Sequence, residues 1–400
     1  MISDRILRPP LIAVAGEDRA HIPRGVFYGF CVATIGGPLA LSALYVPGIV
    51  AGGSVPAWAA TIAGIGLFAA PLTIWLRYSE RVVSSGGLFS FVEAAAGRRL
   101  AYLQGGIWIV SYFLYLPYTI AYVVYDLLPF SFPAVAPLRP VLEVALPIGL
   151  VAAMLSARRL VSGIAALGVA QLILMLVLVG VEGGHGGPAR FGAPGSVALA
   201  SPALAVSLLY VCGSLPLFLG AEVEGGGATV RRGILGAFLA VSGILVLSAL
   251  ALAYVPSGLR SSEIPGQTIA LAYSNPALAR TIGLGAALSV LGLVGAEYLA
   301  LSRLGHAMFD VPRRTAALAI GVPFVAADAV SLVDPDRFYD TLLRPSLIAL
   351  YAAQVIVVLV YPLFRRKTGG LGVTDLVCWA VASSLMGYGL YLASFHPPAT

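Results

Sequence analysis

The residues of this chain that could do chemistry lie inside long apolar segments. Two of these segments, near 26–50 and 203–222, are each interrupted by glycine and proline. A break in a helix frees backbone N–H and C=O groups that lipid cannot satisfy, so breaks occur where those groups line a cavity or meet a ligand. Matching breaks in two halves of a chain are typical of the binding site of a transporter. The candidate substrate-binding residues are therefore Ile35, Gly36, Gly37, Pro38 and Leu39 at the first break, and Tyr210, Val211, Cys212, Gly213, Ser214 and Leu215 at the second.

The two breaks predict pockets of opposite polarity. Pro38 suits the first turn of a helix, so it should open a second half-helix whose N-terminal amides attract an anion such as a carboxylate. At the second break, free carbonyls near Tyr210, Val211 and Cys212 would attract an ammonium group. Facing pockets of this kind suit a zwitterion, hence an amino acid. The alternative is structural: a kink at the first break and a small-residue packing seam at the second.

A row of tyrosines follows in the segment 100–127. Spacings of three and four place most of them on one helical face, where they could line and gate a polar cavity. We expect Tyr115 and Tyr118 to touch a substrate. The alternatives are packing and, near the outer end, an aromatic belt. The row consists of Tyr112, Tyr115, Tyr118, Tyr122 and Tyr125.

Carboxylates inside membrane segments cost roughly 2.5–3.5 kcal/mol on insertion scales and are functional candidates by default. Glu297 lies well within its segment and is the first candidate for proton coupling, and Asp328 is the second. The alternative for Glu297 is an ion pair with an arginine such as Arg303. Four further carboxylates lie near segment ends, where they can face water: Asp126, Glu143, Glu222 and Glu224.

Metal, cofactor and enzymatic chemistry have little support in the sequence. The cysteines Cys31, Cys212 and Cys378 are isolated, and the four histidines are scattered, so we predict no metal site and no cofactor. A membrane-embedded enzyme subunit would need paired histidines or clustered carboxylates within its spans. A channel would be expected to carry a repeated filter sequence, and none is visible.

Composition identifies the elements that must position these residues. The 400-residue chain is 59% hydrophobic and 10% charged, whereas a soluble domain carries about 25% charged residues. It is therefore an all-α polytopic membrane protein, without room for a sizeable soluble domain. We predict eleven spans, near 26–50, 57–77, 100–127, 141–156, 160–180, 203–222, 233–255, 281–303, 315–333, 340–363 and 372–394.

Basic residues set the predicted orientation. With a cytoplasmic N-terminus, 18 of the 24 Lys and Arg residues fall on the cytoplasmic side, which satisfies the positive-inside rule. This places the chain in the cell membrane with its C-terminus outside. The net charge of +6 comes from these short clusters between apolar segments, so it does not indicate nucleic-acid binding.

The order of spans predicts two related halves. Residues 26–180 and 203–363 each hold five spans and open with an interrupted one, after a cytoplasmic segment 1–25 and before an additional helix 372–394. Five is odd, so the second half enters the membrane from the opposite side. This is an inverted-topology repeat.

Several short motifs resemble the amino acid–polyamine–organocation superfamily. Ile35-Gly36-Gly37 is similar to its first-span glycine motif. Ser85-Gly86-Gly87 with Phe89 and Phe91 is similar to its second-to-third span signature. Gly213, Glu222 and Arg231-Arg232 resemble its sixth-span region, and Leu301-Ser302-Arg303 resembles the end of its eighth span. The resemblance implies a leucine-transporter-like core of ten helices and alternating access. It also implies a permease for a small amino acid or related amine, with a nucleobase or another small solute as the alternative.

The chain also departs from that pattern. Many proton-coupled members carry a lysine in the fifth span, and Gln171 to Gly180 contains none. Sodium-coupled relatives use hydroxyls on the eighth span, where Ser289 and Ser302 do not obviously match. A twelfth span is absent, and Pro38 removes an amide at the first break. Coupling to protons, uncoupled exchange, or neither therefore stay open, as do the exact substrate and the oligomeric state.

Overall fold

The structure, a computed structural model, describes residues 22–51, 55–185 and 196–395. Within those ranges every element is a helix, apart from one isolated bridge that joins Ile22 to Val223. In this bridge the Ile22 N–H donates to the Glu222 carbonyl (2.7 Å) and the Glu224 N–H donates to the Ile22 carbonyl (3.2 Å). The chain that enters the first span is thus bound to the end of the sixth span.

Eleven helical segments of the described chain are long and apolar enough to cross a membrane, which confirms the predicted number. Charged or polar turns extend several of them beyond the predicted limits, because a hydropathy pattern shows only the apolar centre of a helix. The spans consist, in order, of α1 (Arg24–Thr34), α2 (Pro38–Ala40), η1 (Leu41–Tyr45) and α3 (Val46–Ile49); α4 (Ala57–Tyr78); α6 (Arg98–Tyr122), η2 (Val123–Leu127) and α7 (Leu128–Ser131); η3 (Pro133–Leu138) and α8 (Arg139–Met154); α9 (Ala157–His185); α10 (Ser196–Leu208) and η4 (Val211–Glu222); α11 (Gly226–Ala251) and η5 (Leu252–Tyr254); α14 (Pro276–Phe309); α15 (Arg313–Ser331); α16 (Pro335–Leu359) and α17 (Tyr361–Thr368); and α18 (Val373–Phe395).

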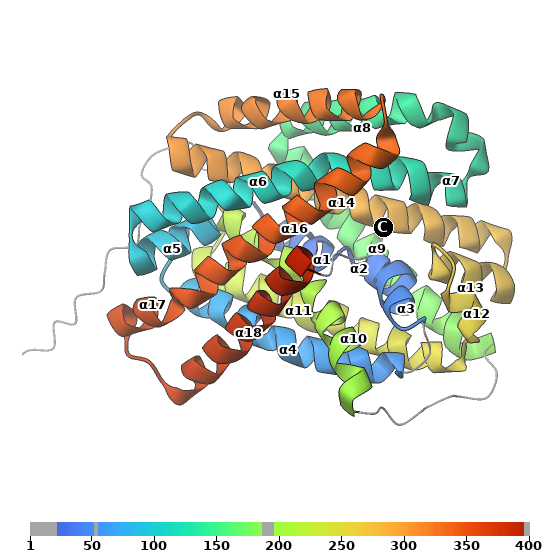
Figure 1. Cartoon of the computed structure of the whole chain (residues 1–400), viewed down its shortest axis with the longest axis horizontal. Coiled ribbons are helices and arrows are strands. Elements are labelled where there is room, and N and C mark those ends of the chain that lie inside the picture. Colours follow the sequence, from blue (N-terminus) through green and yellow to red (C-terminus); the bar gives the residue numbers. More distant parts are fainter. Residues whose placement is uncertain (1–21, 52–54, 186–195, 396–400) are drawn as a thin grey trace, which may run out of the picture.

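Three shorter helices lie between the spans. The short helix α5 (Leu88–Ala96) follows the second span, and α12 (Ser257–Arg260) and α13 (Pro265–Tyr273) precede α14. In Figure 1, α1 and α2 lie in the middle of the molecule, whereas α8 and α15 run along one edge. The burial of the spans agrees: 94% of the apolar window of the first span is buried, against 11% for the fourth. The interrupted first span is therefore the centre of the fold.

The first interruption has the predicted form. Gly36 and Gly37 adopt left-handed backbone angles, with φ of 60° and 63°, and Pro38 opens α2 at its first position. Only glycine adopts such angles without steric cost. A Cβ atom on Gly36 would lie 2.8 Å from the Leu209 carbonyl oxygen, so the lack of a side chain also permits the two interrupted spans to approach each other.

The second interruption differs from the prediction. Free carbonyls were expected there, but the chain passes from α10 through Tyr210 directly into the long 3-10 helix η4. The Tyr210 carbonyl accepts a hydrogen bond from the Gly213 N–H (2.9 Å), and the Val211 carbonyl accepts one from the Ser214 hydroxyl (3.0 Å). These two carbonyls are not free, because the tighter winding of η4 supplies local donors.

Candidate functional site

The centre of the site is the carboxylate of Glu297 on α14. Glu297 is fully buried, and its Oε1 accepts a hydrogen bond from the Cys212 thiol on η4 (Sγ to Oε1, 3.8 Å). Its second oxygen, Oε2, has no hydrogen-bond partner among the described residues. The predicted alternative, an ion pair with Arg303, is wrong, because Arg303 binds Glu222 instead. The carboxylate therefore retains a free acceptor in the interior.

Tyrosines from three further spans surround this carboxylate. Tyr112 of α6 donates to the Cys212 sulfur (4.0 Å), and Tyr45 of η1 and Tyr115 of α6 lie within electrostatic range of Glu297. Tyr351 of α16 lies within range of Cys212. The first, third, sixth, eighth and tenth spans thus each contribute a polar side chain to one buried region. We refer to the five residues Tyr45, Tyr112, Tyr115, Cys212 and Glu297 as the central cluster.

The predicted tyrosine row divides between two locations. Tyr115 belongs to the central cluster, whereas Tyr118 turns to α16. There its ring stacks on Tyr339 with centroids 4.4 Å apart, and the two hydroxyls are hydrogen-bonded at 3.0 Å. The rings of Tyr115 and Tyr118 are 5.5 Å apart, so an aromatic path leads from the cluster to this stack. The sequence did not identify Tyr45, Tyr339 or Tyr351, because nothing local marks them as neighbours of α6.

The amides of the first break are occupied by the chain's own side chains. The Leu39 N–H donates to Gln171 Oε1 (3.4 Å), and the Ala40 N–H donates to Ser289 Oγ (3.3 Å). The Ser289 hydroxyl in turn donates to Gln171 Oε1 (2.7 Å). A Cβ atom on Gly37 would lie 2.8 Å from Ser289 Oγ. In this conformation α9 and α14 therefore cap the half-helix that was expected to receive a carboxylate.

The other predicted residues of the two breaks are buried packing residues. Ile35 is 1% exposed, and a Cβ atom on Gly213 would lie 2.9 Å from its Cδ1. Pro38, Ser214 and Leu215 are also buried, and no contact brings their side chains to Glu297. Cys212 is the one side chain of the second break that reaches the central carboxylate, through its thiol.

Asp328 lies elsewhere, on α15, and is fully buried beside α8. The expectation that Glu143 faces water is wrong, because α8 packs against α15 and Glu143, which is 0% exposed, binds the Ser331 hydroxyl of α15. The part of the chain that the structure describes contains no group of three or more His, Cys, Asp or Glu residues able to hold a metal ion. The structure therefore contains two separate buried carboxyl sites, one at Glu297 and one formed by Glu143 and Asp328.

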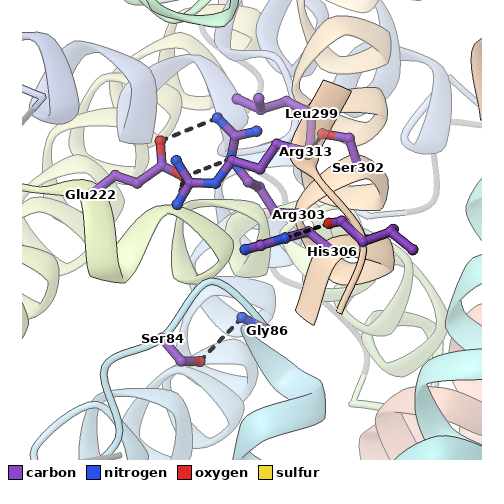
Figure 2. Close-up of polar contacts among 9 residues, drawn as sticks. Ser84, Gly86, Glu222, Leu299, Ser302, Arg303, His306 and Arg313 are labelled. Atoms are coloured by element: carbon purple, nitrogen blue, oxygen red, sulfur yellow. Dashed lines mark hydrogen bonds and ion pairs between the residues drawn. The ribbon is translucent and has the colours of Figure 1, made fainter. Parts of the chain in front are cut away.

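An ion pair joins the end of the sixth span to α14 on the predicted cytoplasmic side (Figure 2). Arg303 of α14 binds Glu222 through two atoms, Nε to Oε1 at 2.6 Å and Nη2 to Oε2 at 3.1 Å. Arg313, at the start of α15, adds a third contact at 3.4 Å. Both Arg303 and Glu222 are nearly buried, with side chains 6% and 11% exposed. Bidentate contacts of this kind are among the strongest in proteins.

Comparison with known proteins identifies the fold. No protein-family model matches the chain, and no curated protein matches it either. Among solved structures, the manganese transporter of Eremococcus coleocola in complex with an aromatic bis-isothiourea substituted compound is 14% identical, with a TM-score of 0.57, and the match covers 94% of this chain and 89% of that one. MhsT in complex with L-phenylalanine is 16% identical, with a TM-score of 0.58, and the match covers 92% of this chain and 98% of that one.

These similarities establish the class of fold. The chain has the leucine-transporter-like fold, with two inverted halves of five spans, interrupted first and sixth spans, and one additional C-terminal helix. The fold prediction is thereby confirmed. The identities, at 14% and 16%, are too low to carry over a substrate, so the function must be argued from this chain's own residues.

Proposed function

We propose that this protein is a secondary transporter of the amino acid–polyamine–organocation type that moves a small amino acid or related amine across the cell membrane by alternating access. The observation that carries the proposal is the Glu297 carboxylate, fully buried where five spans converge, with one oxygen unpartnered among the described residues. A substrate ammonium group would supply the missing partner.

The energetics favour a cationic ligand. A buried carboxylate without a partner costs several kcal/mol, and a hydrogen-bonded cation removes much of that cost. The faces of Tyr45, Tyr112 and Tyr115 add cation–π attraction of about 0.5–2 kcal/mol each where a cation lies over the ring. No arginine or lysine of the described chain forms an ion pair with Glu297. The central cluster therefore favours an amine over an anion.

The carboxylate of an amino acid has a less obvious place. Its natural donors, the amides of Leu39 and Ala40, bind Gln171 and Ser289. A zwitterionic substrate must displace one of these side chains, whereas a simple amine need not. Within the proposal, amines lacking a carboxylate should therefore bind at least as well as amino acids.

Alternating access would require the opening of one end at a time. The Arg303–Glu222 bridge closes the predicted cytoplasmic end, and the Tyr118–Tyr339 stack lies toward the other. Of the central cluster between them, Tyr112 and Glu297 are buried in this conformation, whereas Tyr45, Tyr115 and Cys212 are partly exposed. We further propose that Glu297 takes either the substrate ammonium or a proton. Its occupation would then link proton movement to transport or, without a proton, support exchange.

The test is ligand binding to the purified protein. A thermal-shift screen should include amines, the twenty amino acids and nucleobases, because a ligand at about 100 times its Kd adds roughly 2.7 kcal/mol of stability. We expect amines to stabilise the wild type but not Glu297→Gln, and to be taken up by proteoliposomes in a saturable manner. Glu224→Gln is the matched control, because Glu224 is exposed at the end of η4. Equal stabilisation of both variants would remove Glu297 from the site, and stabilisation by nucleobases alone would change the substrate class.

A further inference from the structure

Two buried carboxyl side chains lie on the packed helices α8 and α15, away from the central cluster. These helices are the fourth spans of the two inverted halves, and they run side by side along one edge of the molecule (Figure 1). Glu143 lies in the second turn of α8, and Asp328 lies in the last turn of α15. Both residues are 0% exposed. The fold thus brings together two acidic residues that are 185 positions apart in the sequence.

Ser331 connects the two helices. Its hydroxyl lies 2.9 Å from Glu143 Oε1 and 2.7 Å from the backbone carbonyl of Asp328, one turn earlier on α15. Glu143 Oε2 and both carboxyl oxygens of Asp328 have no partner among the described residues. Three of the four carboxyl oxygens in this buried region therefore lack a donor.

The surrounding charges do not compensate the two carboxyl groups. Arg139, one turn before Glu143 on α8, donates to the Tyr125 carbonyl (2.7 Å) and lies over the Tyr125 ring, with its guanidinium carbon 5.5 Å from the centroid. The acidic groups that act electrostatically on Tyr125 are Glu143 itself and Asp336 of α16, so Asp336 adds further negative charge on this side.

The other packed helices turn their titratable groups elsewhere. On α6, Tyr118 and Tyr122 contact Tyr339 of α16, and on α14 the hydroxyl of Tyr298 donates to Ala317 (2.8 Å). On α9, Arg158 and Arg159 lie in the first turn, next to the opposite end of α8. The group that acts electrostatically on Asp328 is Glu143 itself.

We propose that Glu143 and Asp328 share one exchangeable proton and form a proton-binding site separate from the central cluster. Two carboxylates in a region of low dielectric cannot both be ionised at little cost, because like charges repel strongly there. The binding of one proton removes one of the two negative charges and with it this repulsion. A hard metal ion takes six or more oxygen ligands, and Glu143, Asp328 and Ser331 offer fewer.

The placement gives this site a role that does not depend on the central cluster. Glu143 lies near the N-terminal end of α8 and Asp328 near the C-terminal end of α15, and both of these ends face outward in the predicted topology. Release of the proton would leave two like charges between α8 and α15, the fourth spans of the two halves, and would push these helices apart. The binding of the proton stands without the proposed transport function, whereas an effect on uptake rests on it.

The experiment is infrared difference spectroscopy of the purified full-length chain between acidic and alkaline buffer, with the carboxylic acid C=O band as the readout. In the wild type we expect one protonated carboxyl band that Glu143→Gln and Asp328→Asn each abolish. The double variant should lose no more than either single variant. Glu297→Gln is the matched control for another buried carboxyl group, and it should leave this band in place.

Three results would overturn the proposal. Independent protonation would give two bands, each removed by one variant. A metal ion would make the band disappear on addition of Na⁺, Mg²⁺ or Ca²⁺ at constant pH. Complete ionisation would give no band. Circular dichroism and size-exclusion chromatography establish that each variant is folded, and Asp328→Glu, which keeps both carboxyl groups, should retain the band. None of these readouts uses transport, so failure of the proposed function leaves this test intact.

Discussion

Arg303 binds Glu222 through two nitrogen atoms: Nε lies 2.6 Å from Oε1, and Nη2 lies 3.1 Å from Oε2. Arg303 lies on α14 six residues after Glu297. Because its guanidinium is committed to the end of η4, the carboxylate of Glu297 remains without a cation. One pairing on the predicted cytoplasmic side thus leaves the centre of the fold open to a positively charged ligand.

The first prediction concerns this bridge. Arg303→Gln should lower the free energy of unfolding by about 3 kcal/mol, because removal of one member of a buried ion pair leaves the other uncompensated. Thermal or denaturant unfolding of the purified variant measures the effect. The exposed Arg314 supplies the control, since Arg314→Gln should change stability by less than about 0.5 kcal/mol. Equal stability of the two variants would mean that the bridge contributes little.

The second prediction concerns the cap of the first break. Gln171→Leu should cost roughly 1–3 kcal/mol of stability, because it leaves the Leu39 amide and the Ser289 hydroxyl without their acceptor. Gln104→Leu is the matched control. Gln104 is 1% exposed, and its amide atoms have no hydrogen-bond partner among the described residues, so its replacement should be neutral or stabilising. The reverse order of the two stabilities would refute the cap.

The third prediction concerns access to the central cluster. In a background of Cys31→Ser and Cys378→Ser, Cys212 is the remaining thiol of the chain, and it reports on the cluster. Tyr118→Ala removes the stack on Tyr339 and should increase the labelling rate of Cys212 by a membrane-impermeant maleimide added from outside. Tyr28→Ala, at a side chain 37% exposed, should leave the rate unchanged. An unchanged rate in both variants would show that the stack does not limit access.

The fourth prediction concerns coupling. If Glu297 carries the proton that moves with the substrate, Glu297→Gln should abolish the stimulation of uptake by an imposed pH gradient, because an amide cannot take up and release a proton at neutral pH. Uptake into proteoliposomes with and without the gradient measures this effect. A gradient response that survives in Glu297→Gln but is lost in Asp328→Asn would assign coupling to the carboxyl pair of α8 and α15.

The sequence alone predicted those features of the fold that depend only on neighbouring residues in the chain. Glycine at 36 and 37 and proline at 38 dictate left-handed angles and a helix start without reference to any other residue. Apolar length alone gives eleven spans. The order of spans in two halves predicted the inverted repeat, and the resemblance of the short motifs implied the leucine-transporter-like core.

Contacts between residues far apart in the chain could not be predicted from the sequence. The approach of Cys212 to Glu297 and of Gln171 to Ser289 depends on how α9, α14 and η4 rotate about their axes, which hydropathy does not encode. Glu143 appeared to be a water-facing end residue because its cover, α15, lies far away in the chain. The second interruption contains a proline, yet it continues as a 3-10 helix since its local hydrogen bonds survive.

The bridge between Ile22 and Val223 has a mechanical consequence. It joins the start of the first span to the end of the sixth span. The two spans also approach each other closely at Gly36, where a Cβ atom on Gly36 would lie 2.8 Å from the Leu209 carbonyl oxygen. Contacts at two separate points restrict the sliding of the first and sixth spans past each other. We therefore expect the two interrupted spans to move together, so that a ligand that displaces Cys212 also displaces Gly36 and Gly37, which it does not contact.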